Sequence, residues 1–229
     1  MKTSQETCRL MRWFTAVVLL VLAWPETSIS SDANSARPDR KSVVVLGDSL
    51  AAGYGLDPAE AFPALLQNRI DEAGLSFAVV NAGVSGDTSA GGLRRIDWLL
   101  KRSIDVLVLE LGGNDGLRGI AVGSTRTNLQ AIIDRTKQKF PQVKIVIAGM
   151  QMPSNMGQEY IAAFRKIFPE LAKANDAALI PFLLEGVGGK PALNLPDLIH
   201  PTAEGQRIVA GNVWQVLKPV LEKIKPAGQ

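Results

Sequence analysis

Short apolar runs alternate along the chain with longer segments whose apolar residues recur at helical spacing. The first run, at residues 43–46, contains three consecutive valines and stops at a glycine, which is typical of a strand buried on both faces of a parallel sheet. Four later runs predict strands at residues 76–81, 104–111, 143–148 and 179–183. The helical pattern predicts helices at residues 58–74, 88–101, 127–140, 158–174 and 202–224. Pro219 should bend or shorten the last of these helices.

Strands that alternate with helices at this interval predict βαβ units with right-handed crossovers. We therefore expect an α/β fold of the flavodoxin-like type, with three α/β/α layers and a central five-stranded parallel sheet. The strand order 2-1-3-4-5 is assumed from analogy with flavodoxin-like folds. Whatever the order, the carboxyl ends of parallel strands share one edge, and ligands bind at that edge in open α/β sheets.

Residues 1–30 have the pattern of a secretory signal peptide. Three basic residues, Lys2, Arg9 and Arg12, precede an apolar run of about a dozen residues, and small residues follow at positions 28 and 30. An N-terminal membrane anchor is the alternative, but the run is shorter than the ~20 residues that a bilayer-spanning helix needs. We therefore expect a secreted or periplasmic protein with no stable membrane span after cleavage, consisting of a polar linker at 31–42 and one domain at 43–225.

Composition narrows the classes of function. The chain has 229 residues, of which 46% are hydrophobic and 21% charged, and this suits a single globular domain with a sizeable core. Its net charge is only +3 and no basic run is interleaved with aromatic residues, so we expect no nucleic-acid partner. The single cysteine, Cys8, would leave with the signal peptide, which excludes disulfides and cysteine-bound zinc from the mature protein. We expect a monomer that acts on a small molecule.

Four loops at the predicted sheet edge carry candidate chemistry. The first holds Ser49, the second Gly86 and the third Asn114, while the last holds Asp197 and the only histidine, His200. A serine nucleophile usually needs an imidazole to take its proton, and only His200 can supply one. Asp197 lies three residues earlier, close enough to hold the other ring N–H. The backbone N–H groups of Ser49 and Gly86 and the Asn114 amide are candidate donors to an oxyanion.

Each of these residues also has an ordinary structural explanation. Ser49 and His200 are suited to helix starts, Gly86 to a turn and Asn114 to a cap. Their coincidence at one sheet edge favours a site. Three nearby carboxylates are expected to support the loops by accepting backbone N–H bonds: Asp48, Asp87 and Asp115. One histidine and no mature cysteine make a metal site improbable on chemical grounds, and we expect no cofactor.

These residues resemble the four sequence blocks of the SGNH (GDSL) hydrolases. The resemblance rests on Gly47-Asp48-Ser49-Leu50, Gly86, Gly113-Asn114-Asp115 and Asp197-x-x-His200, and it covers residues 43–221. The segments 47–56 and 81–89 are most similar to the bacterial secreted arylesterase, acyl-CoA thioesterase I and lysophospholipase group. One departure is Leu198, where many members of the family have glycine.

The resemblance implies hydrolysis of an acyl ester or thioester through an acyl-serine intermediate, without a cofactor. It implies Ser49 as nucleophile, His200 as base and Asp197 as the partner that orients the base. It also implies that the Ser49 N–H, the Gly86 N–H and the Asn114 amide form the oxyanion hole.

The sequence is also compatible with other functions. A carbohydrate O-acetyl esterase of the same fold uses the same blocks, and a non-catalytic flavodoxin-like binding module is the alternative outside enzymes. The second is disfavoured because Asp48 would repel a phosphate. An α/β-hydrolase needs Gly-x-Ser-x-Gly, and Ala51 breaks that pattern. Candidate acyl-pocket residues are apolar and lie on or beside these loops: Leu117, Met150, Met152, Leu184, Val187 and Leu195. The irregular segment 151–157 is expected to be mobile and to contact substrate.

Overall fold

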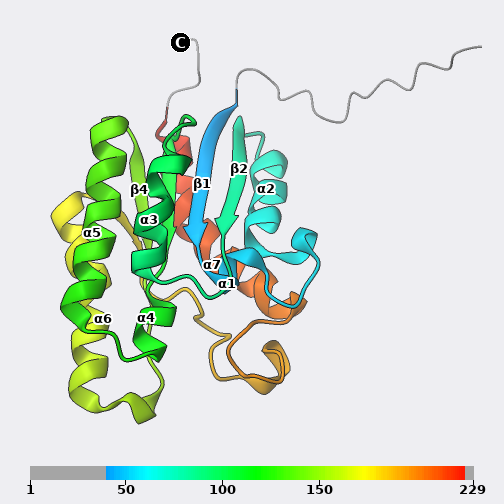
Figure 1. Ribbon diagram of the computed structural model, residues 1–229. Helices are drawn as coiled ribbons and strands as arrows, with labels where there is room; N and C mark the ends of the chain where they lie inside the picture. Colours follow the sequence, from blue (N-terminus) through cyan, green and yellow to red (C-terminus); the bar gives the residue numbers. More distant parts are fainter. Residues whose placement is uncertain (1–39, 225–229) are drawn as a thin grey trace, which may run out of the picture. The chain divides into compact units, whose positions relative to one another are not determined.

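Five parallel strands form the central sheet, in the order β2-β1-β3-β4-β5 (Figure 1). The computed structural model describes residues 40–224. The strands are β1 (Lys41–Gly47), β2 (Phe77–Gly83), β3 (Val106–Glu110), β4 (Lys144–Ala148) and β5 (Ala178–Ile180). Every pair of neighbouring strands is parallel. The expected α/β fold and its strand order are therefore confirmed, and β1 lies inside the sheet.

Helices cover both faces of this sheet. The helices are α1 (Ser49–Ala52), α2 (Phe62–Glu72), α3 (Ser89–Leu99), α4 (Gly113–Leu117), α5 (Val122–Lys139), α6 (Gln158–Asn175) and α7 (Ala203–Glu222). Helix α2 packs against α7, and α5 packs against both α3 and α6 (Figure 1). Three 3₁₀ turns lie in the connections: η1 (Pro58–Glu60), η2 (Ser154–Met156) and η3 (Pro191–Leu193). The result is the three-layer arrangement expected for βαβ units.

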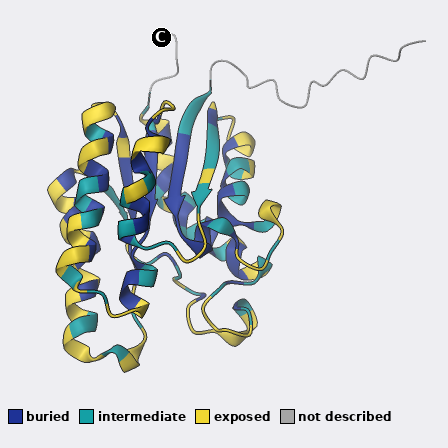
Figure 2. Ribbon diagram, viewed as in Figure 1, coloured by how far each residue is buried: buried dark blue, intermediate teal, exposed yellow. Residues whose placement is uncertain are grey.

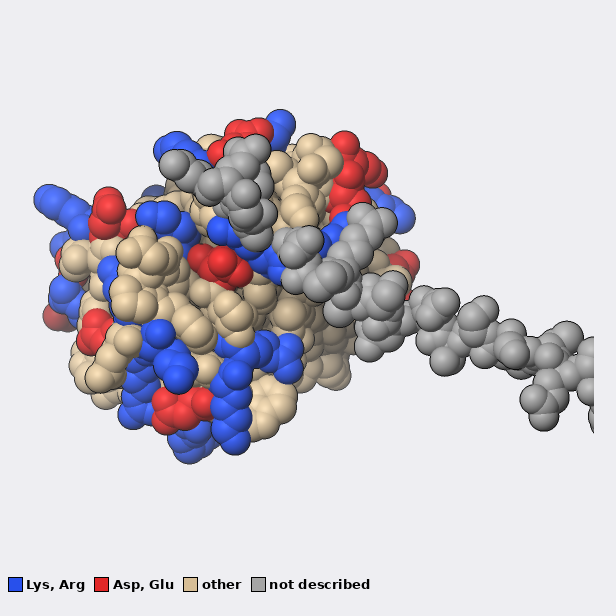
Figure 3. Space-filling view, turned by 90° about the horizontal axis from the view of Figure 1, so that it is seen from above, with Lys and Arg blue, Asp and Glu red and all other residues tan. Residues whose placement is uncertain are grey.

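The core lies between the sheet and its two helix layers (Figure 2). All five residues of β3 are buried, as are the last five of β1. This explains why both strands read as continuous apolar runs rather than as alternating patterns. On the face at the amino ends of the strands, basic and acidic side chains are interspersed (Figure 3). No helix within residues 40–224 is long and apolar enough to cross a membrane.

Several element boundaries differ from the sequence expectation. The strand β1 begins at Lys41, inside the segment interpreted as a linker, and β5 has only three residues. The helix expected from residue 58 begins at Phe62, after the separate turn η1. Pro219 does not end α7, which continues to Glu222, because a proline one turn from the end removes few helical hydrogen bonds. The segment expected to be a signal peptide, 1–30, lies outside the described residues.

Gln206 ties the last helix to the carboxyl end of β1. Its side chain is 1% exposed. Its Oε1 accepts the backbone N–H of Phe62 at 2.9 Å, and its Nε2 donates to the carbonyl of Leu50 at 3.1 Å. One side-chain amide therefore links α7 to both α1 and α2. Gln206 lies six residues after His200, and its partner Leu50 directly follows Ser49.

Replacing Gln206 with leucine should lower the free energy of unfolding by about 2–4 kcal/mol, because two buried backbone groups lose their only side-chain partner. Urea denaturation of the full chain measures this. Gln215→Leu, on the exposed side of the same helix, is the control and should change stability by no more than about 0.5 kcal/mol. Equal effects of the two substitutions would contradict the role given to Gln206.

Candidate active site

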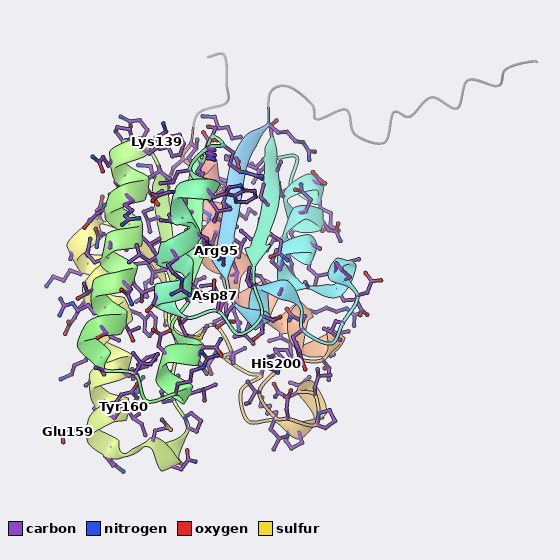
Figure 4. The ribbon with its side chains drawn as sticks, viewed as in Figure 1. Asp87, Arg95, Lys139, Glu159, Tyr160 and His200 are labelled. Atoms are coloured by element: carbon purple, nitrogen blue, oxygen red, sulfur yellow. The ribbon has the colours of Figure 1, made fainter. Side chains whose placement is uncertain are left out.

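Ser49 and His200 meet at the carboxyl edge of the sheet, although 151 positions separate them in the chain. Ser49 is the first residue of α1, directly after β1. His200 precedes α7 and lies beyond the carboxyl ends of the strands (Figure 4). The Nε2 atom of His200 lies 2.9 Å from the Ser49 Oγ, and its Nδ1 lies 2.7 Å from Asp197 Oδ2. The structure thus brings together the three residues that the sequence selected, in a geometry that allows a base to take the serine proton.

The turn at Asp197 fixes both the carboxylate and the imidazole. Asp197 Oδ1 accepts the backbone N–H groups of Ile199 and His200, each at 2.9 Å. Leu198, between Asp197 and these two residues, is in the left-handed conformation, with φ of 60°. The N–H of His200, then the imidazole, then the N–H of Ile199 lower the pKa of Asp197 to about 2. The carboxylate is therefore charged at any pH at which an imidazole is neutral. The leucine that departs from the family pattern sits at a position where glycine costs least.

The three candidate oxyanion donors lie on three neighbouring loops. The N–H of Ser49 is in the first turn of a helix, where it has no partner within the helix. Gly86 has φ of 79°, and within residues 40–224 its N–H donates to no other group. Asn114 Nδ2 donates to Asp48 Oδ2 at 3.1 Å and to the carbonyl of Asp87 at 3.0 Å. Asn114 therefore links all three loops, and both of its amide N–H groups already donate hydrogen bonds to Asp48 and Asp87.

The carboxylates expected to support the loops do so in two different ways. Asp48 Oδ1 accepts the N–H of Leu50, and Asp115 Oδ2 accepts the N–H of Ser89. These two agree with the expectation. Asp87 differs, because its carboxylate pairs with the side chain of Arg95 at 2.7 Å rather than with a backbone N–H (Figure 4).

Two buried carboxyl groups lie beside Ser49. Burial raises the pKa of Asp48 to about 6, although hydrogen bonds from the Leu50 N–H and the Asn114 amide oppose the shift. Glu110, the last residue of β3, is fully buried, and burial followed by repulsion from Asp48 raises its pKa well above the ordinary value. Glu110 was not among the residues that the sequence pattern selected. The available signal was an acidic residue at the end of an otherwise apolar strand.

Exposed apolar side chains lie on the segments that carry the site. Among the described residues six large hydrophobic side chains are exposed, and five of them lie on the segments that follow β1, β2 and β3 or that carry His200: Tyr54, Val84, Leu117, Leu198 and Ile199. The ring of Tyr54 lies 4.4 Å from the imidazole of His200, a contact that the sequence gave no reason to expect. We call these five residues the apolar rim.

The expected acyl-pocket residues do not form one group. Met150 and Val187 are buried in the core, so their inclusion was wrong. Met152 instead lines a cleft of about 630 Å³ between η2 and α6, together with Ser154, and no residue of the Ser49–His200–Asp197 set lines it. Leu195 packs close to Gly55, beside Tyr54. Within residues 40–224 no three His, Cys, Asp or Glu side chains are grouped so that they could hold a metal ion.

Known proteins resemble this chain in sequence and structure. The profile of the GDSL-like Lipase/Acylhydrolase family matches residues 45–208. Esterase TesA of Pseudomonas aeruginosa is 43% identical over 182 residues, which cover 79% of this chain and 90% of that protein. Thioesterase 1/protease 1/lysophospholipase L1 of Escherichia coli K12 is 39% identical over 181 residues, or 79% of this chain and 85% of that protein.

The fold matches solved esterases of the same kind. The crystal structure of the psychrotrophic esterase EstA from Pseudoalteromonas sp., inhibited by monoethylphosphonate, has a TM-score of 0.75 and 32% identity, and the match covers 80% of this chain and all of that one. Family profile, relatives and fold agree with one another. The chain belongs to the GDSL-like lipase/acylhydrolase family of SGNH hydrolases and is a carboxylic ester hydrolase.

Proposed function

We propose that Ser49, His200 and Asp197 carry out two-step acyl transfer to water. The observation that supports this most directly is the 2.9 Å contact between Ser49 Oγ and His200 Nε2. His200 takes the serine proton as Oγ attacks the acyl carbon, and it then gives that proton to the departing alcohol or thiol. In the second step His200 takes a proton from water, the water oxygen attacks the acyl-serine, and the proton returns to Ser49 as the acid leaves.

The oxyanion formed in each step is held by the N–H groups of Ser49 and Gly86 and by the Asn114 amide. Each such donor contributes roughly 10²–10³ in rate when it points at the developing charge. The first two N–H groups have no competing hydrogen bond among the described residues. Asn114 donates to the oxyanion the N–H that otherwise donates to the Asp87 carbonyl.

The proposed substrates are acyl esters with an apolar part, among them aryl and lysophospholipid esters, and acyl thioesters. The apolar rim supports this choice, since exposed apolar side chains gathered at a site indicate contact with an apolar ligand. It also favours such substrates over the small acetyl groups of a carbohydrate O-acetyl esterase. The names of relatives are consistent with this range, since one is an esterase and another a thioesterase and lysophospholipase.

We also propose that residues 1–30 are a secretory signal peptide and that the mature enzyme works as a secreted or periplasmic monomer. The basic residues and short apolar run near the start of the chain support the first part. A single chain supplies every proposed catalytic group, which is consistent with the second.

A fluorophosphonate probe should label Ser49 and no other residue, as located by peptide mass mapping. Ser49→Ala should abolish labelling and lower kcat by about 10⁶-fold, because the nucleophile is removed. His200→Ala should also abolish labelling, because the Ser49 hydroxyl loses its base. Ser124→Ala, an exposed serine on α5, is the control and should behave as the wild type. Labelling that persists in Ser49→Ala would refute the assignment.

The carboxyl group of Asp197 should stay charged over the whole pH range in which the enzyme is active. Its pKa is about 2, because the N–H of His200, the imidazole and the N–H of Ile199 all donate to it, so it loses its charge only near that pH. Carbon NMR of the Asp197 carboxyl, identified by its absence from Asp197→Asn, should show no titration above pH 4 alongside a full activity profile. A carboxyl signal that moves in parallel with activity would contradict the proposal.

A series of p-nitrophenyl esters from acetate to palmitate should give the highest kcat/KM beyond acetate, because longer acyl chains bury more apolar surface at the rim. Measuring kcat/KM for each ester at one pH is sufficient. A strict preference for acetate would instead favour the O-acetyl esterase.

A further inference from the structure

Glu110 is a buried acid for which the proposed mechanism has no use. Its side chain is fully buried at the carboxyl end of β3. Its Oε2 accepts the backbone N–H of Asp48 at 3.0 Å, while its Oε1 has no hydrogen-bond partner within the described residues. The carboxyl group lies directly against the turn before Ser49, because a Cβ atom placed on Gly47 would clash with Oε2.

The charged groups around this turn determine where a negative charge is tolerated. Both oxygens of Asp48 accept hydrogen bonds, one from the Leu50 N–H and one from the Asn114 amide. Arg95, the cation of α3 that reaches the turn, is already paired with the Asp87 carboxylate and with the Gly47 carbonyl. Glu110 faces Asp48 and no cation among these groups. Two neighbouring carboxyl groups in a buried site do not both ionise readily. Both oxygens of Asp48 have a donor, whereas Oε1 of Glu110 has none, so the charge belongs on Asp48.

We propose that Glu110 is a positioning residue that remains a neutral carboxylic acid, with its proton on Oε1 and with Oε2 holding the turn that carries Ser49. An unpartnered neutral O–H costs much less in a buried site than an unpartnered anionic oxygen, which agrees with the lone position of Oε1. Burial, followed by repulsion from Asp48, raises the pKa of this carboxyl and outweighs the opposing hydrogen bonds from the N–H groups of Asp48 and Ala51. The role in catalysis rests on Ser49 being the nucleophile, whereas the protonation state does not.

A neutral acid at this position suits the reaction. The oxyanion forms beside the N–H of Ser49, one residue from the N–H that Glu110 accepts. A second anion there, in addition to Asp48, would raise the energy of the developing charge, and water cannot screen it in a buried site. A protonated carboxyl group keeps the hydrogen bond that fixes the turn without adding that charge.

Infrared difference spectroscopy of the full chain at pH 8 tests the protonation state. This pH is above the pKa of about 6 of Asp48, so Asp48 is charged there. The wild type should show the C=O stretch of a protonated carboxylic acid, shifted by deuterium exchange, and Glu110→Gln should lack it. Glu72→Gln, an exposed glutamate on α2, is the control and should retain the band. Absence of the band from the wild type, or its persistence in Glu110→Gln, would overturn the proposal.

Kinetics of two variants test the positioning role. Glu110→Gln keeps a neutral group of the same shape with an acceptor for the Asp48 N–H, so it should retain most of the wild-type kcat. Glu110→Ala removes the acceptor and should lower kcat by about 10²-fold at similar KM, because the nucleophile is displaced. Thermal melting establishes that each variant is folded. A Glu110→Gln variant that loses as much kcat as Glu110→Ala would overturn the neutral-acid role, as would full activity of a folded Glu110→Ala.

Failure of this inference and failure of the proposed function are distinguishable. If the fluorophosphonate probe does not label Ser49 in the wild type, the nucleophile assignment is wrong even where the infrared band is present. If Ser49 is labelled and the band is absent, the enzyme mechanism stands and Glu110 is an anion.

Discussion

Hydrogen bonds across the carboxyl edge of the sheet hold together four loops that are remote in sequence, and the chemistry depends on them. A parallel sheet brings the strand ends to one edge, but it does not fix the loops to within the distance of a proton transfer. That precision comes from Asn114, which binds both the loop after β1 and the loop after β2. Gln206 does the same for the segment of His200, since it holds α7 against the carbonyl of Leu50.

Holding the site in this way carries a cost in stability. Leu198 adopts a left-handed conformation that costs about 1–2 kcal/mol for a residue other than glycine. Asp48 and Glu110 place two acids in a buried position where an apolar pair would pack without charge. Unfavourable groups of this kind gather at functional sites because the surrounding structure determines their geometry. The core beneath them, with β1 and β3 almost wholly buried, supplies the compensating stability.

The sequence predicts the elements whose pattern is set by burial. It does not predict residues whose role depends on neighbours that only the folded chain brings together. Apolar runs located all five strands, because strands buried on both faces cannot contain many polar residues. The strand order needed analogy, since no residue pattern encodes which strands are neighbours. Ser49 and His200, which the structure places in contact, were selected because a lone histidine leaves one choice of base. Glu110 was missed because its significance depends on burial beside Asp48, which a linear pattern does not reveal. The short helices α1 and α4 were also not predicted, because one turn is too short for apolar residues to recur at helical spacing.

The resting hydrogen bonds of Asn114 bear on how the site distinguishes a transition state from a substrate. Both amide protons are engaged, one by the Asp48 carboxylate and one by the carbonyl of Asp87. Under the proposed mechanism, the carbonyl oxygen of a bound ester is no better an acceptor than the Asp87 carbonyl, so Asn114 gains nothing by turning to the substrate. An oxyanion is different, because hydrogen bonds to charged acceptors are roughly twice as strong.

The amide proton is then drawn from the Asp87 carbonyl only as negative charge develops. An interaction that strengthens between ground state and transition state raises kcat, whereas one that is equal in both only tightens binding. Under the proposed mechanism, the competing carbonyl of Asp87 makes Asn114 selective for the charged state. The same reasoning explains why the carboxylate of Asp48 is tolerable so close to the reaction: its two oxygens are occupied by fixed donors, Leu50 and Asn114, and its charge is offset before the substrate arrives.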